Sequence, residues 1–222
     1  MKKRIAPIAA LLATALLAMA LFAAGCSSNT TAPQDPAPAL TEQGAATQAG
    51  AVAFAIAQVG PEIVRFTGTA KADYSHTFAG DVAGTVYLNY RTGGPTGTPA
   101  TPGTGDWARL YTAVGAPLAA TVGTGSVTLG LDITAVITQG TSSAVLGGGG
   151  TFHSGVHTAL FTFTNLAVTE VGNYPTGGSM TFTAPLFAMT VTFDGTNIAV
   201  IDVTGHGQWS LNLDTGVLTA LP

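Results

Sequence analysis

The amino-acid sequence predicts a mainly β protein with a single antiparallel β-barrel or β-sandwich domain and one short N-terminal helix. Several segments after Pro61 alternate apolar and polar residues, which is the period of a strand with one buried face. Gly, Asp and Asn residues of the kind that form hairpin turns separate these segments. One alanine-rich segment, residues 42–59, has the apolar spacing of a helix instead.

The N-terminus has the three parts of an export signal. Residues 2–4 are basic, residues 5–22 form an apolar run, and the sequence Ala23-Ala24-Gly25 supplies small residues before Cys26, the only cysteine in the chain. An uncleaved transmembrane helix is the alternative, since the run approaches the roughly 17–25 residues that a span needs. The run is rich in alanine and lacks a basic flank at its end, so cleavage is the favoured interpretation.

Residues 21–26, Leu-Phe-Ala-Ala-Gly-Cys, resemble the lipobox of a bacterial lipoprotein signal peptide. The resemblance implies cleavage after Gly25 and attachment of acyl chains, such as palmitate, to Cys26. Two or more acyl chains hold a protein stably at a membrane without spanning it. In this family Ser27 favours the outer membrane, so the expected location is the cell envelope, at its periplasmic face or at the cell surface.

Three regions follow from this pattern. Residues 1–25 are the predicted signal peptide, residues 26–40 a lipid-anchored flexible linker rich in proline, and residues 41–222 one β-rich domain. The helix over residues 42–59 would bury one stripe of side chains and end at Gly60-Pro61. The stripe comprises Ala45, Ala49, Val52, Ala53, Ile56 and Val59. A strand is the competing interpretation, because Val52, Phe54 and Ile56 also alternate.

The strands are predicted from period-two alternation and turn signals. They cover residues 82–90, 127–138, 161–164, 189–193, 198–203, 208–213 and 217–221. Loops rich in Gly, Pro and Thr are predicted at residues 92–105, 147–150 and 174–178. Six inward aromatic side chains would fill a core or line a cavity for an apolar ligand: Phe161, Phe163, Phe182, Phe187, Phe193 and Trp209.

Composition excludes some classes of partner. The 222-residue chain has 7 Lys and Arg against 11 Asp and Glu, and loss of residues 1–25 would leave four basic residues and a formal charge of −7. So few basic residues argue against binding to nucleic acid or anionic lipid. The C-terminus and the few Trp and Tyr residues also lack the aromatic pattern of a transmembrane barrel.

Candidate chemistry is weak throughout the chain. His153 and His157 are the best metal-ligand candidates, with His76 or His206 as further ligands, but four residues of strand span about 13 Å, too far for one ion unless a bulge intervenes. Two further sets are considered and disfavoured: a triad of Ser210, His206 and Asp214, and a carboxylate pair of Asp132 and Asp202. No catalytic residue and no cofactor is predicted.

The favoured function is therefore that of a noncatalytic, membrane-anchored envelope module with a binding or structural role. Its partners would be the membrane, through Cys26, and a protein or an apolar small molecule. A periplasmic carrier of a lipid or another apolar small molecule is the first alternative. An envelope hydrolase is the second, and it would require several of the four histidines to converge with an acid.

Overall fold

The structure is a computed structural model that describes residues 40–65, 73–184 and 187–222. The predicted signal peptide, Cys26 and the linker up to residue 39 lie outside the described residues. One compact unit contains every described residue. None of the described helices is both long enough and apolar enough to cross a membrane.

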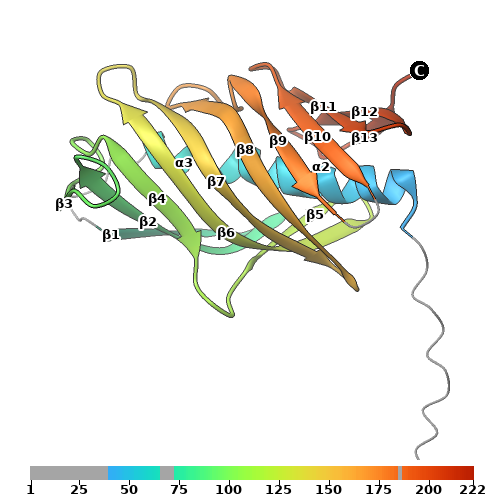
Figure 1. Cartoon of the computed structure of the whole chain (residues 1–222), viewed down its shortest axis with the longest axis horizontal. Helices are drawn as coiled ribbons and strands as arrows, with labels where there is room; N and C mark the ends of the chain where they lie inside the picture. Colours follow the sequence, from blue (N-terminus) through green and yellow to red (C-terminus); the bar gives the residue numbers. More distant parts are fainter. Residues whose placement is uncertain (1–39, 66–72, 185–186) are drawn as a thin grey trace, which may run out of the picture. The chain divides into compact units, whose positions relative to one another are not determined.

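All 13 strands of the described residues belong to one antiparallel sheet, which confirms the predicted fold class (Figure 1). The helices are α2 (Glu42–Val59) and α3 (Glu62–Arg65). The strands are β1 (Asp73–Phe78), β2 (Val82–Thr92), β3 (Thr98–Pro99), β4 (Trp107–Thr112), β5 (Leu118–Val122), β6 (Gly125–Thr138), β7 (Ser143–Ser154), β8 (His157–Thr169), β9 (Gly177–Thr183), β10 (Ala188–Phe193), β11 (Ile198–Val203), β12 (Gly207–Asn212) and β13 (Leu218–Ala220).

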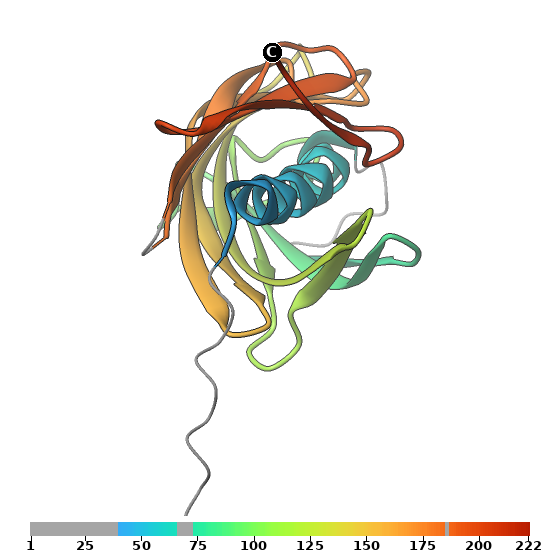
Figure 2. The same ribbon diagram turned by 90° about the vertical axis from the view of Figure 1, so that its right-hand side faces the viewer.

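The sheet curls around α2, as Figure 2 shows. The helix contacts β5 and β6 in one half of the sheet and β10, β11 and β12 in the other half. A single curled sheet takes the place of the two facing sheets that a sandwich would need. No pairing among the described strands joins β1 to β13, so the curled sheet remains open between these two edges.

Helix α2 begins and ends where the sequence predicts. The hydroxyl oxygen of Thr41 accepts a hydrogen bond from the Gly44 N–H at 3.1 Å and caps the first turn. The buried surface is wider than the predicted stripe, because 13 of the 18 helix residues are buried. Small alanine side chains allow the sheet to approach the helix from several sides, and a helix that is apolar all round belongs in a core.

The short helix α3 follows directly and was not predicted. Its position is fixed by Tyr90 of β2, a fully buried side chain whose hydroxyl donates to the Ile63 carbonyl oxygen at 3.1 Å. Burial and the nearby Glu62 raise the pKa of Tyr90. The hydroxyl therefore stays neutral and remains a hydrogen-bond donor.

The alternation in β2 and β6 is confirmed. Every odd position from Val127 to Ile137 is buried, and in β2 the alternation buries Val82, Val86, Leu88 and Tyr90. Of the six aromatic residues predicted to face inward, Phe161, Phe182 and Phe193 are fully buried, and the other three pack against the core. The hairpin predicted at Asp194-Gly195 connects β10 to β11.

The prediction of a loop at residues 147–150 is wrong. These glycines lie inside β7, where a bulge shifts the pairing with β8 between Leu146 and Gly149. Gly148 has a φ of 74°, and a Cβ there would lie 2.6 Å from the carbonyl oxygen of Asp132. The glycine run is thus required by the close approach of two strands. The predicted 92–105 loop also contains the two-residue strand β3.

Candidate functional site

The outer face of β2, β4 and β6 gathers aromatic and charged side chains. Strand pairing aligns these outward residues in three rows. The rows are Tyr87, Tyr111 and Asp132; Asn89, Arg109 and Thr134; and Arg91, Trp107 and Val136. We call these nine residues the outer platform. The intervening residues of the same strands, such as Leu88, Leu110 and Ile133, are buried against the core, so alternation places the platform on the convex face.

Arg109 lies at the centre of the outer platform and contacts two residues of the first row. Its Nε and Nη2 donate to the two carboxylate oxygens of Asp132 at 2.7 and 2.9 Å. Its guanidinium carbon also lies 5.1 Å from the ring centroid of Tyr111, within the range of a cation–π contact. These hydrogen bonds hold the pKa of the Asp132 carboxyl below its usual value and raise the pKa of Arg109.

The two tyrosines of the first row stack on each other. The ring centroids of Tyr87 and Tyr111 are 5.6 Å apart, and the ring planes differ by 25°. Tyr87 is 36% exposed, and at the other end of the platform Val136 is 63% exposed. Val136 pairs with Val145 of β7, which is also exposed. An apolar strip therefore continues the third row beyond β6.

A hollow of about 420 Å³ lies over the outer platform. Pro95, in the loop between β2 and β3, lines it together with seven of the platform residues. Two contacts hold this loop: Arg91 Nη1 donates to the Gly97 carbonyl oxygen at 2.8 Å, and the Gly93 N–H donates to the Asp106 carboxylate at 3.0 Å. The loop that carries Pro95 over the hollow is thus held near both of its ends.

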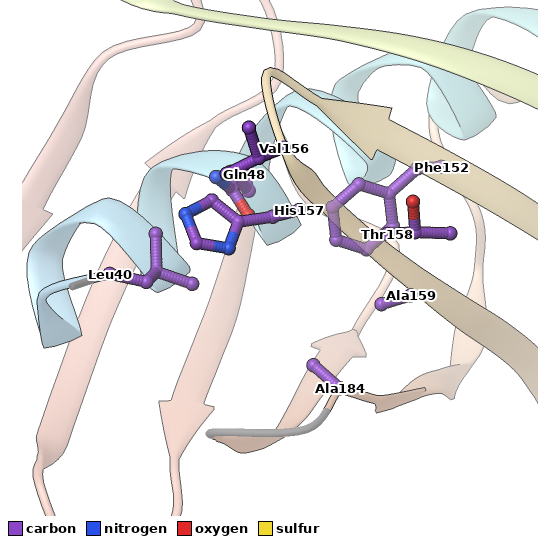
Figure 3. A pocket seen from close by; sticks show the side chains of 8 residues that line it. All are labelled: Leu40, Gln48, Phe152, Val156, His157, Thr158, Ala159 and Ala184. Atoms are coloured by element: carbon purple, nitrogen blue, oxygen red, sulfur yellow. The ribbon is translucent and has the colours of Figure 1, made fainter. Parts of the chain in front are cut away.

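A second, smaller cavity of about 110 Å³ lies beside the first half of α2 (Figure 3). It is lined by Leu40, Gln48, Phe152, Val156, His157, Thr158, Ala159 and Ala184. Gln48 is the one buried polar or charged side chain among the described residues, with 7% of its surface exposed. Sequence reasoning missed Gln48, and its only signal was a polar residue within an alanine-rich helix.

The predicted metal candidates His153 and His157 do not face each other. The expectation of one extended segment is wrong, because a turn at Gly155-Val156 reverses the chain, and His153 pairs with Thr158 while His157 pairs with Ser154. His153 Nδ1 lies 2.8 Å from the Thr158 hydroxyl on the exposed face. His157 faces the small cavity instead.

The other two histidines contact acids at separate places. His76 Nδ1 lies 3.2 Å from Glu62, and His206 Nδ1 lies 3.2 Å from Glu42. Within the described residues no three His, Cys, Asp or Glu side chains come together in a way that could hold a metal ion.

In the described part of the chain, the structure shows no hydrogen bonds within either of the two catalytic sets considered from the sequence, the triad of Ser210, His206 and Asp214 and the pair of Asp132 and Asp202. The Ser210 hydroxyl donates to the Thr219 carbonyl oxygen, while Asp214 accepts from Tyr174 and from Asn197. These two donors lower the pKa of Asp214. In the considered carboxylate pair, Asp132 belongs to β6 and Asp202 to β11, with four strands between them in the sheet.

Sequence reasoning missed the outer platform as well. Its signal was Trp107-x-Arg109-x-Tyr111, a period-two run of large residues on one face of a strand. Comparison of the chain with protein-family models, with curated proteins and with solved structures found no match.

Proposed function

We propose that this protein is a noncatalytic, lipid-anchored envelope module whose outer platform binds a partner protein. The lipid on Cys26 would hold the chain at the membrane, and the linker would separate the folded unit from it. The sequence pattern of residues 2–26 supports the anchor, and the outer platform supports the binding role.

The observation that carries the binding role is the residue content of the platform. Tyr, Trp and Arg are the residues most enriched at the energetic centres of protein interfaces. The described residues include three arginines, and two of them, Arg91 and Arg109, lie in this one grid. In a chain with 11 acidic and 7 basic residues, the platform brings two arginines together with the partly exposed rings of Tyr87, Trp107 and Tyr111.

The chemistry of the platform indicates the kind of partner surface. Arg109 already shares its charge with Asp132, whereas Arg91 donates only to a backbone carbonyl in the contacts described above. A partner with a carboxylate near Arg91 and an apolar or aromatic side chain in the hollow would complement the site. A standard interface buries about 800 Å² per partner, so contacts should continue onto the neighbouring strands β1 and β7.

The alternatives have less support. The carrier hypothesis assigned the ligand to the interior of the sheet, and α2 occupies that space. The hydrolase hypothesis required converging histidines, and the four histidines make their contacts at different places, two of them with separate glutamates.

The test is photocrosslinking in intact cells of the native organism. A photoreactive amino acid replaces Thr134, in the middle row of the platform, and a matched variant carries it at Thr192, an exposed threonine of β10. We expect a discrete crosslinked protein band from position 134 and none from position 192. The band should weaken by about tenfold or more when Arg109 is changed to Ala, the loss expected at an interface hot spot.

Two results would contradict the proposal. Equal crosslinking from both positions would indicate nonspecific contact of the whole surface. A band that Arg109→Ala leaves unchanged would show that the platform chemistry is not what the partner recognises. Circular dichroism of the variant confirms that the fold is retained.

A further inference from the structure

We propose that the small cavity beside Gln48 is a binding site for a small neutral molecule with a compact apolar body and a carboxamide-like head group. This site is separate from the outer platform and does not depend on its function. It is formed by α2, the β7–β8 turn and the end of β9 (Figure 3).

The first argument is the state of the Gln48 side chain. It is 93% buried in a helix whose other buried side chains are apolar, and no hydrogen bond to its amide is found among the described residues. No buried side-chain nitrogen or oxygen in the described chain is both sealed and unpaired, so the amide must reach the open space of the cavity. Because the amide is accessible from the cavity and makes no hydrogen bond to the described residues, a ligand in the cavity could donate to it and accept from it.

The second argument is the size of the cavity and the nature of its walls. Five of its eight lining residues are apolar, including Phe152, Ala159 and Ala184. An apolar cavity of about 150 Å³ in another protein holds benzene, so the present 110 Å³ would fit a body of about four to six non-hydrogen atoms. Val156, which is 71% exposed, and the partly exposed His157 lie at the turn beside the cavity and give a route of entry.

The third argument is the chemistry of the polar groups. The Gln48 amide both donates and accepts hydrogen bonds, and the His157 imidazole also lines the cavity. None of the lining residues is Lys, Arg, Asp or Glu. A head group that donates and accepts at once, such as a carboxamide, matches this set, whereas a carboxylate would lack a permanent cation.

Fluorine NMR tests the proposal at pH 7.5 with the full chain purified from the membranes of its native organism and placed in lipid nanodiscs, with empty nanodiscs as the reference. The probe is 4,4,4-trifluorobutanamide, and the matched probe is 4,4,4-trifluorobutanoate, which has the same apolar body and a charged head. We expect the amide to bind at least about tenfold more tightly than the acid, the effect of one net hydrogen bond.

Two variants on α2 separate binding from stability. Gln48→Leu removes the buried amide and should abolish the preference for the amide probe, while Gln58→Leu alters an exposed glutamine of the same helix and should leave it unchanged. Ala159→Leu should fill the cavity and prevent binding of both probes, and Ala184→Leu fills it from another wall if the first variant does not fold.

The proposal is overturned if the amide probe shows no saturable binding to the native chain. It is also overturned if Gln48→Leu binds the amide as well as the native chain does, or if a folded cavity-filling variant still binds it. A preference for the acid probe would show that a charged ligand was the correct class and would reject the carboxamide.

Discussion

At the residue scale, Gly148 is a position that a larger side chain could occupy only with strain and a collision. Its φ of 74° is unfavourable for other residues, and a Cβ would lie 2.6 Å from the Asp132 carbonyl oxygen across the strand pair. Gly155 also has a positive φ, 57°, but a Cβ there has nothing within 4 Å. A comparison of substitutions at Gly148 and Gly155 therefore separates the cost of backbone strain from the cost of a steric collision.

We predict that Gly155→Ala lowers the free energy of unfolding by about 1 kcal/mol, the cost of a left-handed alanine. Gly148→Ala should lower it by at least about 2 kcal/mol, because the collision adds to that strain. Urea denaturation followed by tryptophan fluorescence gives both values. Equal losses in the two variants would show that β7 and β6 do not approach each other as described.

Tyr90 gives a second residue-scale prediction. Changing Tyr90 to Phe keeps the buried ring and removes the hydroxyl that donates to the Ile63 carbonyl oxygen. We expect a loss of about 1–2 kcal/mol in the free energy of unfolding. Tyr87→Phe, at an exposed ring on the same strand, is the matched control and should change stability by less than about 0.5 kcal/mol. A Tyr90→Phe variant with an unchanged free energy of unfolding would argue against the attachment of α3 to β2.

The Arg109–Asp132 pair predicts a pH dependence. Hydrogen bonds from Arg109 lower the pKa of Asp132 in the folded protein below the unfolded value of about 3.9. The stabilisation is therefore complete above that value and is lost as the pH falls through the lower folded pKa. Both side chains are about half exposed or more, so the effect should stay below about 1 kcal/mol.

The measurement is the pH dependence of unfolding for the native chain and for Asp132→Asn. The native chain should lose more stability than the variant between about pH 4 and pH 2. Parallel curves for the two proteins over that interval would contradict the assigned pair.

At the scale of elements, α2 is the part of the core against which both halves of the sheet pack. Ile56 is fully buried in it, whereas Gln58, two residues later, is exposed. We predict a loss of about 2–5 kcal/mol for Ile56→Ala and a change within about 0.5 kcal/mol for Gln58→Ala. Thermal unfolding of the two variants checks this, and a small loss for Ile56→Ala would place α2 outside the core.

The bounds of α2 were predictable because they depend on local chemistry. Thr41 caps the first turn through its own hydroxyl, and the helix ends at Gly60, where the sequence also has Pro61. The width of its buried surface was not predictable, because it depends on strands such as β11 that are distant in sequence. An alanine-rich helix can be buried on one side or on all sides, so the sequence does not distinguish the two patterns.

Among the strands too, local sequence patterns were predictable, and features that depend on pairing with other strands were not. β6 alternates strictly and was predicted almost over its whole length. β7 was missed at residues 147–150, since a run of glycines carries a turn signal in the sequence while the bulge that needs it is defined only by pairing with β6 and β8. Short strands such as β3 and β5 carry too few residues to show a period.

At the scale of the whole molecule, the fold class was readable from the sequence and the candidate sites were not. The outer platform depends on the register of β2, β4 and β6, which brings Tyr87, Arg109 and Asp132 together from three separate segments. The Gln48 cavity depends on the β7–β8 turn lying beside α2. The four histidines were considered as metal ligands because of their residue type, and the fold places them at separate positions.

The central claim is that a lipid attached to Cys26 anchors the folded unit to a membrane. Intact mass spectrometry of the protein purified from the membranes of its native organism tests this most directly. The account predicts a polypeptide that begins at Cys26 and carries the added mass of a diacylglyceryl group and an amide-linked acyl chain. A product that retains residues 1–25, or that begins at an unmodified Cys26, would contradict it.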